Sequence, residues 1–212
     1  MSLINSLIKE GWLKTKIIVE AFQKIKRGDF LAPSSLGEGG LPGDIKNSAE
    51  LNIALPIGFG QTISQPLTVA FMIELLQPKR GEKILDIGSG SGWTTALLAQ
   101  IVGEKGKVVA LEIVPELKKM GEKNVAKYSF VKKETVKFIL GDGSKGYEKE
   151  APYDKILASA SGNNLPLNWK KQLKIGGKIV CPIGSSIWLF VKKNKNDFES
   201  MEYPGFSFVP LI

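Results

Sequence analysis

From residue 83 onward, short apolar runs alternate with segments of helical periodicity, and this alternation restricts the possible folds more than any other feature of the chain. Strands are predicted at residues 83–87, 107–112, 136–140, 155–159, 178–181, 187–191 and 206–209. Helices are predicted between them, at residues 93–101, 115–127 and 165–173. The pattern indicates an α/β fold with a doubly wound, mostly parallel sheet and helices on both faces. The last strands have no helix between them and are expected to be antiparallel.

The first part of the chain has a different pattern. Residues 3–25 show helical periodicity, with a break expected near Gly11. Residues 28–60 are irregular and rich in glycine and proline, and a stretch of this length is often functional. A further helix is predicted at 66–76, with Ser64 able to cap its free N–H groups.

These patterns suggest how the chain is organised. Residues 1–80 are expected to form a helical extension with substrate-side loops, packed on a core formed by residues 81–212. A chain of 212 residues fits one compact domain made of both parts.

Composition excludes several kinds of chemistry. The chain has no histidine and one cysteine, so Ser-His and Cys-His nucleophile pairs and clustered-cysteine zinc sites are excluded, and no metal site is expected. It has no apolar run of about 18 residues and no signal-peptide pattern. We therefore expect a cytoplasmic protein that does not bind a membrane.

The chain is basic, with 29 Lys and Arg against 21 Asp and Glu and a formal net charge of +8. A solvated lysine surface and a nucleic-acid-binding face both remain open. Arg27 and Arg80 are the only arginines, and this scarcity weakens the nucleic-acid interpretation because arginine is preferred for phosphate and base contacts.

A glycine-rich loop after the first core strand is the most informative motif. The candidate ligand-binding residues in and just before this loop are Asp86, Gly88, Ser89, Gly90 and Gly92. Such a loop lets main chain approach a ligand where parallel strands end. Glu112 ends the next strand, twenty residues after Gly92, where a carboxylate can accept both hydroxyls of a ribose.

The details of this loop favour one cofactor. A dinucleotide-binding loop has the pattern G-x-G-x-x-G, whereas this one has G-x-G-x-G, with Trp93 in the place of the third glycine. Asp86 would repel a pyrophosphate and favour a cation. S-Adenosylmethionine carries an ammonium and a sulfonium and no phosphate, so it fits better. Asp142 and Gly143 follow the third strand, where the carboxylate could accept the adenine amino group.

S-Adenosylmethionine is a methyl donor, and the sequence constrains the acceptor of that methyl group less than it constrains the cofactor. The Asn/Asp-Pro-Pro-aromatic motif that is common in amino-group methyltransferases is missing from residues 159–164. A carboxylic acid acceptor has a pKa of about 4 and is ionised at neutral pH, so it needs no histidine base. A carboxylate acceptor therefore fits this composition, although Asp or Glu bases keep other acceptors open.

Several motifs resemble the protein-L-isoaspartate O-methyltransferase family. The most specific runs from Gly58 to Pro66 and reads Gly-Phe-Gly-Gln-Thr-Ile-Ser-Gln-Pro. Further matching segments lie at residues 27–33, 55–58, 86–92, 141–143, 151–154, 172–177 and 208–211. The resemblance covers nearly the whole chain from about residue 20.

The resemblance implies repair chemistry. The family transfers a methyl group from S-adenosylmethionine, leaving S-adenosyl-L-homocysteine, to the free carboxylate of L-isoaspartyl residues in damaged proteins. The matching positions make Ser64 the catalytic residue and place Thr62, Ile63 and Ser64 at the substrate. The positions implied for the cofactor are Gln61, Glu112 with Ile113, and Asp142 with Gly143.

The chain also departs from the family pattern. Glu50 and Asn52 stand where an acidic residue and an aromatic are usual, and Leu67 replaces a common histidine. Residues 36–45 are unusually rich in glycine. Because these changes lie on the peptide side, methylation of RNA or of another protein group, or a catalytically impaired family member, remains an alternative.

Overall fold

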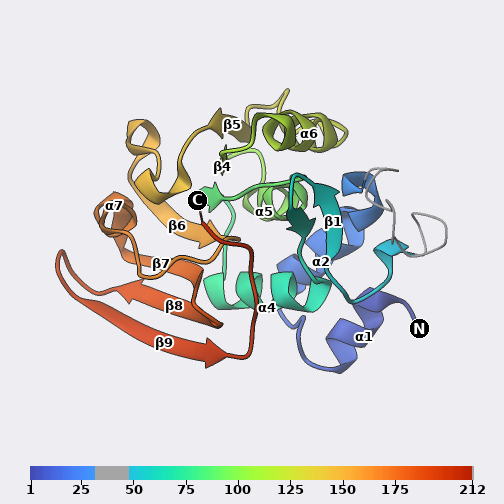
Figure 1. Cartoon of the computed structure of the whole chain (residues 1–212), viewed down its shortest axis with the longest axis horizontal. Coiled ribbons are helices and arrows are strands. Elements are labelled where there is room, and N and C mark those ends of the chain that lie inside the picture. Colours follow the sequence, from blue (N-terminus) through green and yellow to red (C-terminus); the bar gives the residue numbers. More distant parts are fainter. Residues whose placement is uncertain (32–47, 212) are drawn as a thin grey trace.

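The computed structural model describes residues 1–31 and 48–211, and its centre is a seven-stranded sheet (Figure 1). The strands lie in the order β5-β4-β3-β6-β7-β8-β9. Their bounds are β3 Lys83–Ile87, β4 Lys107–Glu112, β5 Val136–Leu140, β6 Tyr153–Ala158, β7 Leu173–Ile183, β8 Ser186–Lys192 and β9 Phe198–Pro204. Pairing is parallel from β5 to β7 and antiparallel from β7 to β9. The expected doubly wound, mostly parallel sheet is confirmed.

Helices cover both faces of this sheet. The helices are α1 Leu3–Lys9, α2 Lys16–Lys24, α4 Pro66–Leu76, α5 Trp93–Val102, α6 Pro115–Ala126 and α7 Leu167–Gln172. Side chains of α2, α4, α5 and α6 pack with Ile84 of β3 in one buried cluster. On the other face, Leu85 packs in a second cluster with Trp169 of α7. Alternate residues of β3 therefore enter opposite cores, as a strand that is buried on both sides requires. No helix in the described residues is long and apolar enough to cross a membrane.

The N-terminal helices belong to the larger core. Gly11 adopts a φ of +78° between α1 and α2, so the break expected there is confirmed. Leu7 of α1 and Phe22 of α2 lie in the same buried cluster as the sheet residue Val180. The division into residues 1–80 and 81–212 stays a prediction, and the glycine-rich residues 36–45 lie outside the described residues.

A small antiparallel sheet connects the extension to the core. It consists of β1 Leu55–Gly58 and β2 Gln61–Ile63, and α4 follows it directly. The N-cap of α4 is Gln65, without a side-chain hydrogen bond, so the expected cap by Ser64 is wrong. Pro66 occupies the first turn, where a missing N–H costs nothing.

The strand predicted at 206–209 is also wrong. The seventh strand is β9, whose mostly exposed polar residues hide it from a pattern based on apolar runs. Phe206 and Phe208 do alternate with polar residues, but their segment leaves the sheet edge and crosses toward the carboxyl ends of the central strands (Figure 1). There the amide of Ser161 donates to the carbonyl of Val209 at 2.8 Å, and the amide of Leu211 donates to the carbonyl of Ser161 at 2.8 Å.

We expect Leu85→Ala to lower the free energy of unfolding by about 2–5 kcal/mol, because Leu85 is 0% exposed in the central strand and its removal leaves a cavity. Urea denaturation would measure this change. The matched control is Leu167→Ala, at a side chain that is 69% exposed, with an expected change within about 0.5 kcal/mol. Equal effects of the two substitutions would contradict this placement of the core.

Candidate active site

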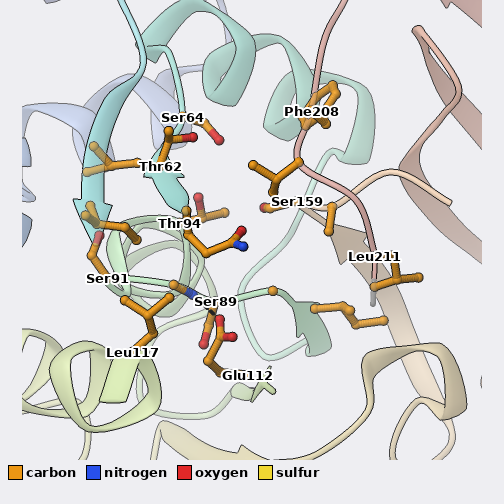
Figure 2. Close-up of a pocket in the computed structure, with 18 of the residues that line it drawn as sticks. Thr62, Ser64, Ser89, Ser91, Thr94, Glu112, Leu117, Ser159, Phe208 and Leu211 are labelled. Carbon is orange, nitrogen blue, oxygen red and sulfur yellow. Dashed lines mark hydrogen bonds between the residues drawn. The ribbon is translucent and has the colours of Figure 1, made fainter. Parts of the chain in front are cut away.

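A cavity of about 510 Å³ lies at the carboxyl ends of β3, β4 and β6. The chain continues from β3 to β4 on one side and returns later to β6 on the other, so the strand order reverses at this point. Parallel sheets bind ligands in the crevice at such a reversal, and cavities of roughly 300–1,000 Å³ hold small molecules. Figure 2 shows Ser89 and Glu112 below the cavity, Thr62 and Ser64 on one side, and Phe208 and Leu211 on the other.

The glycine loop after β3 forms the bottom of the cavity. Gly88, Ser89 and Gly90 all line it. Gly88 and Gly90 have φ angles of +74° and +52°, in the region that favours glycine. A Cβ atom on Gly90 would also lie 3.2 Å from Cδ1 of Ile57. Bare main chain therefore faces the cavity where the sequence predicts cofactor contacts.

Gly92 packs against α6. It is not among the residues that line the cavity. A Cβ atom there would lie 2.9 Å from the carbonyl oxygen of Gly121 and 2.9 Å from Val125. Gly92 therefore allows α6 to pack closely behind the loop, and its contact with a cofactor stays a prediction.

Glu112 connects the glycine loop to the end of β4. Its Oε2 accepts a hydrogen bond from the amide of Gly90 at 2.8 Å. Its Oε1 accepts from the amides of Ile113 and Val114 at 2.9 and 3.0 Å. Glu112 is 5% exposed, and both Glu112 and Ile113 line the cavity. An ionised carboxylate has about four acceptor positions, so three amides leave about one of them for a ligand hydroxyl.

Asp86 lies behind the cavity, and its role in cofactor binding stays a prediction. It is 0% exposed and is not part of the cavity lining. Its Oδ2 accepts from the hydroxyl of Thr95 at 2.5 Å, and its Oδ1 has no partner in the described residues. Burial raises the pKa of Asp86 to about 7; the hydrogen bond from Thr95 opposes this shift, and the charge of Glu112 adds to it.

The segment after β5 places main chain at the cavity. Gly141 and Gly143 line it, whereas the side chain of Asp142 does not. The Asp142 carboxylate accepts from the amide and hydroxyl of Ser144 at 2.9 and 2.6 Å, and Lys145 lies 3.2 Å away. The hydrogen bonds from Ser144 lower the pKa of Asp142. It is therefore ionised at neutral pH, with its carboxylate engaged in this turn.

The motif that most resembles the isoaspartyl family forms another side of the cavity. Gln61, Thr62, Ile63 and Ser64 all line it. Thr62 and Ser64 both extend toward the central space in Figure 2. We call Thr62, Ile63 and Ser64 the acceptor side, and Gly88, Ser89, Gly90 and Glu112 the cofactor side, after the roles that the sequence predicts for them.

Two of the departures from the family pattern contact each other. Oδ1 of Asn52 accepts from the amide of Leu67 at 3.0 Å, and Nε2 of Gln65 donates to the carbonyl of Asn52 at 3.0 Å. Asn52 thereby satisfies a free N–H at the start of α4 that Ser64 was expected to cap. Glu50 accepts from the amide of Leu3 at 3.1 Å and ties the same loop to α1.

The sequence did not predict the side of the cavity formed by the end of the chain. Residues 205–211 line it together with Ser159. The ring of Phe206 stacks on Phe71 of α4 at 5.6 Å. The one sequence signal for this side was the match of residues 208–211 to the family pattern, and the resemblance implied no role for these residues.

The charges around the cavity are few. Among the described residues that line it, Glu112 has the only ionisable side chain. No lysine or arginine of this lining is available to neutralise a phosphate, in contrast to the net charge of +8 of the whole chain. The lining fits a nucleoside with a cationic rather than a phosphorylated end, and S-adenosylmethionine is such a ligand. The described residues also contain no group of three or more His, Cys, Asp or Glu able to hold a metal ion.

Comparisons with known proteins identify the family. The family profile described as Protein-L-isoaspartate(D-aspartate) O-methyltransferase matches residues 1–212. The chain belongs to this family. A relative named protein-L-isoaspartate O-methyltransferase from Methanopyrus kandleri is 38% identical, over 99% of this chain and 89% of its own length. Protein-L-isoaspartate O-methyltransferase 1 of Archaeoglobus fulgidus is 44% identical, over 81% of this chain and 78% of its own.

Solved structures agree with this membership. A protein-L-isoaspartate O-methyltransferase matches 98% of this chain with a TM-score of 0.84 and 28% identity, and this chain covers 64% of that longer one. A Plasmodium falciparum protein, solved in complex with S-adenosyl-L-homocysteine, matches with a TM-score of 0.84 over 99% of this chain and 96% of its own. At 23% identity, the latter match supports the fold alone. The resemblance drawn from the sequence is confirmed, and the comparisons do not favour the alternative acceptors.

The pKa of Asp86 leads to a prediction about stability. A carboxyl with a pKa of about 3.9 in the unfolded chain and about 7 in the folded protein binds its proton more tightly when folded. Its contribution to stability is fully present below about pH 4 and is lost as the pH rises through about 7. We expect Asp86→Asn to reduce the fall in the free energy of unfolding between about pH 5 and pH 8, measured by urea denaturation.

Asp142→Asn is the matched control for this experiment. Because the pKa of Asp142 is lowered, its contribution is lost only as the pH falls through that lowered value, below about pH 4. The control should therefore follow the wild-type slope in the same pH interval. An unchanged slope in Asp86→Asn would show that this carboxyl does not titrate there.

The close packing of α6 leads to a prediction about ligand affinity. A Cβ atom on Gly121 would lie 2.8 Å from the carbonyl oxygen of Gly90 and 3.0 Å from Phe138. We expect Gly121→Ala to displace the glycine loop and to weaken S-adenosyl-L-homocysteine binding by about tenfold, or about 1.4 kcal/mol, in calorimetry. Lys119→Ala, on the exposed side of α6, should bind like the wild type. Wild-type affinity in Gly121→Ala would rule out this role of the packing.

Proposed function

We propose that this chain transfers the methyl group of S-adenosylmethionine to the free carboxylate of L-isoaspartyl residues in damaged proteins. The observation that carries the proposal is the lining of the cavity. Among its described residues Glu112 has the single ionisable side chain, and three main-chain amides hold it. This described lining offers no free general base. It therefore suits an acceptor that arrives already ionised, as a carboxylate does at neutral pH.

The cofactor side provides the contacts for the nucleoside. Gly88, Ser89 and Gly90 would place their main chain against it, and the remaining acceptor position of Glu112 would bind a ribose hydroxyl. Gln61 and Ile113 would contact it from the cavity lining. The segment at Asp142 and Gly143 would adjoin the adenine, with its main chain rather than the engaged carboxylate. The cofactor supplies a methyl group on a positively charged sulfur, which is a good leaving group.

The acceptor side would orient the peptide. Thr62 and Ile63 would contact the peptide next to the isoaspartyl residue, and the hydroxyl of Ser64 would donate a hydrogen bond to the acceptor carboxylate. The residues of this chain contribute mainly orientation, because an ionised oxygen attacking in line with the leaving group needs no proton transfer. The resulting ester collapses to a succinimide, which hydrolyses partly to normal aspartate.

Asp86 would act from behind this site. The charge of Glu112 acts on the buried carboxyl of Asp86, and a cation in the cavity would favour the ionised form of Asp86. We therefore assign Asp86 an electrostatic role without direct contact. Isoaspartyl-containing peptides and proteins are the proposed partners, and the cytoplasm is the proposed location.

Methyl transfer to matched peptides tests the proposal. We expect labelled methyl groups from S-adenosylmethionine to reach an isoaspartyl peptide and not the same peptide with normal aspartate. Ser64→Ala should lower kcat/KM for the isoaspartyl peptide by tenfold or more, because a hydrogen bond to a charged group contributes about 1.5–3 kcal/mol. Its affinity for S-adenosyl-L-homocysteine should stay near the wild-type value.

The control is Ser200→Ala, at an exposed position of β9 that is not among the residues lining the cavity. It should retain wild-type kinetics. Wild-type protein that methylates neither peptide would overturn the proposed function, whereas full activity of Ser64→Ala would overturn only the role of Ser64.

A further inference from the structure

A buried arginine lies directly behind the acceptor side. Arg27 begins the 3-10 helix η1 Arg27–Phe30 and is 6% exposed. Its Nη1 donates to the carbonyls of Leu51 at 3.0 Å and Ala49 at 3.5 Å. Its Nη2 donates to the carbonyls of Ile53 at 2.7 Å and Ser64 at 3.2 Å. One guanidinium thus joins the main chain of the loop before β1 to the main chain of Ser64.

The same guanidinium contacts a third segment. Its central carbon lies 5.5 Å from the ring centroid of Trp93, the first residue of α5. The ring of Trp93 lines the cavity and also packs edge-on against Phe22 of α2, at 5.7 Å. An arginine over an aromatic ring is attracted to it, so Arg27 and Trp93 hold each other in place.

The charge and the hydrogen bonds of Arg27 indicate that this side chain positions the main chain around it. Burial lowers the pKa of Arg27 to about 10, so the side chain stays charged at neutral pH. Within residues 1–31 and 48–211, every hydrogen-bond acceptor of this guanidinium is a main-chain carbonyl. A buried charge is costly, and a planar fork with donors on both nitrogens can satisfy carbonyls in two directions at once. The ammonium of a lysine has one nitrogen and cannot reproduce that geometry.

We propose that Arg27 is a positioning residue for the acceptor side, which fixes Ser64 and the 49–53 loop relative to the cofactor side. Ala54 follows this loop and lines the cavity, as Ser64 does. The glycine loop is held separately, by the hydrogen bond from Gly90 to Glu112. Loss of the fork should therefore move the acceptor carboxylate relative to the methyl donor, while the nucleoside contacts stay in place. The inference rests on the methyl transfer proposed above.

Two substitutions test it by separating charge from geometry. Arg27→Lys keeps the charge and loses the fork, whereas Arg27→Gln keeps a planar group with two N–H donors and loses the charge. We expect Arg27→Lys to lower kcat/KM for the isoaspartyl peptide by about tenfold or more, with S-adenosyl-L-homocysteine affinity within about threefold of the wild type. We expect Arg27→Gln to be less impaired than Arg27→Lys.

Arg80→Lys, the same substitution at the other arginine of the chain, is the control and should leave both quantities unchanged. A purely structural role would lower peptide turnover and cofactor affinity by the same factor, and that result would overturn the proposal. So would wild-type kinetics in Arg27→Lys, or a failure of both Arg27 variants to fold. Absence of isoaspartyl methylation by the wild type would instead overturn the proposed function, so the two failures are distinguishable.

Discussion

The hydrogen bond between the amide of Gly90 and the carboxylate of Glu112 holds the two central strand ends together. It joins the loop after β3 to the end of β4 at the point where the strand order reverses. The loop can reach Glu112 because Gly88 and Gly90 adopt positive φ angles, and α6 can support it from behind because Gly92 and Gly121 carry no side chain. A side chain at any of these positions would move the bottom of the cavity, and the ligand-binding geometry with it.

The distribution of charge is the second constraint. A chain with a net charge of +8 encloses a cavity whose described lining contains no basic side chain. Several lysines instead form ion pairs away from the cavity, such as Lys107 and Lys137 with Glu150. The net charge is therefore a property of the outer surface, and the electrostatics of the cavity depend on Glu112, with Asp86 buried behind it.

Sequence patterns predicted the parallel core well and selected the residues of the cofactor side, which the structure places together in the cavity lining, because both depend on local signals. The apolar runs of β3 to β6 and the glycine loop each leave a direct mark on the sequence. β9 left none, because the polar residues of an antiparallel edge strand do not form an apolar run. The sequence did not show that Asp86 and Gly92 lie outside the cavity lining. A residue in or next to a glycine loop can face away from the cavity, and only its contacts, here with Thr95 and Gly121, show the direction.

The acceptor side was found through its resemblance to a family, since its geometry depends on contacts between distant parts of the chain. Arg27 reaches Ser64 across 37 positions, and Asn52 reaches Leu67 across 15. No periodic pattern encodes contacts of this kind. The same reason explains why the lining by residues 205–211 was not predicted, and why a strand was expected at 206–209 instead.

Helix α4 connects two opposite edges of the cavity. Near its start, the amide of Leu67 donates a hydrogen bond to Asn52 beside the acceptor side. Further along the helix, Phe71 stacks on Phe206 of the segment 205–211 that lines the cavity. Because both edges contact one helix, a peptide bound according to the proposed function would have to fit between them. On the proposed function, an isoaspartyl residue inside a well-packed protein would be reached only when that protein opens locally, as native proteins do to different extents in different regions. Selection of damaged targets would then depend on how readily they unfold locally as well as on the altered residue.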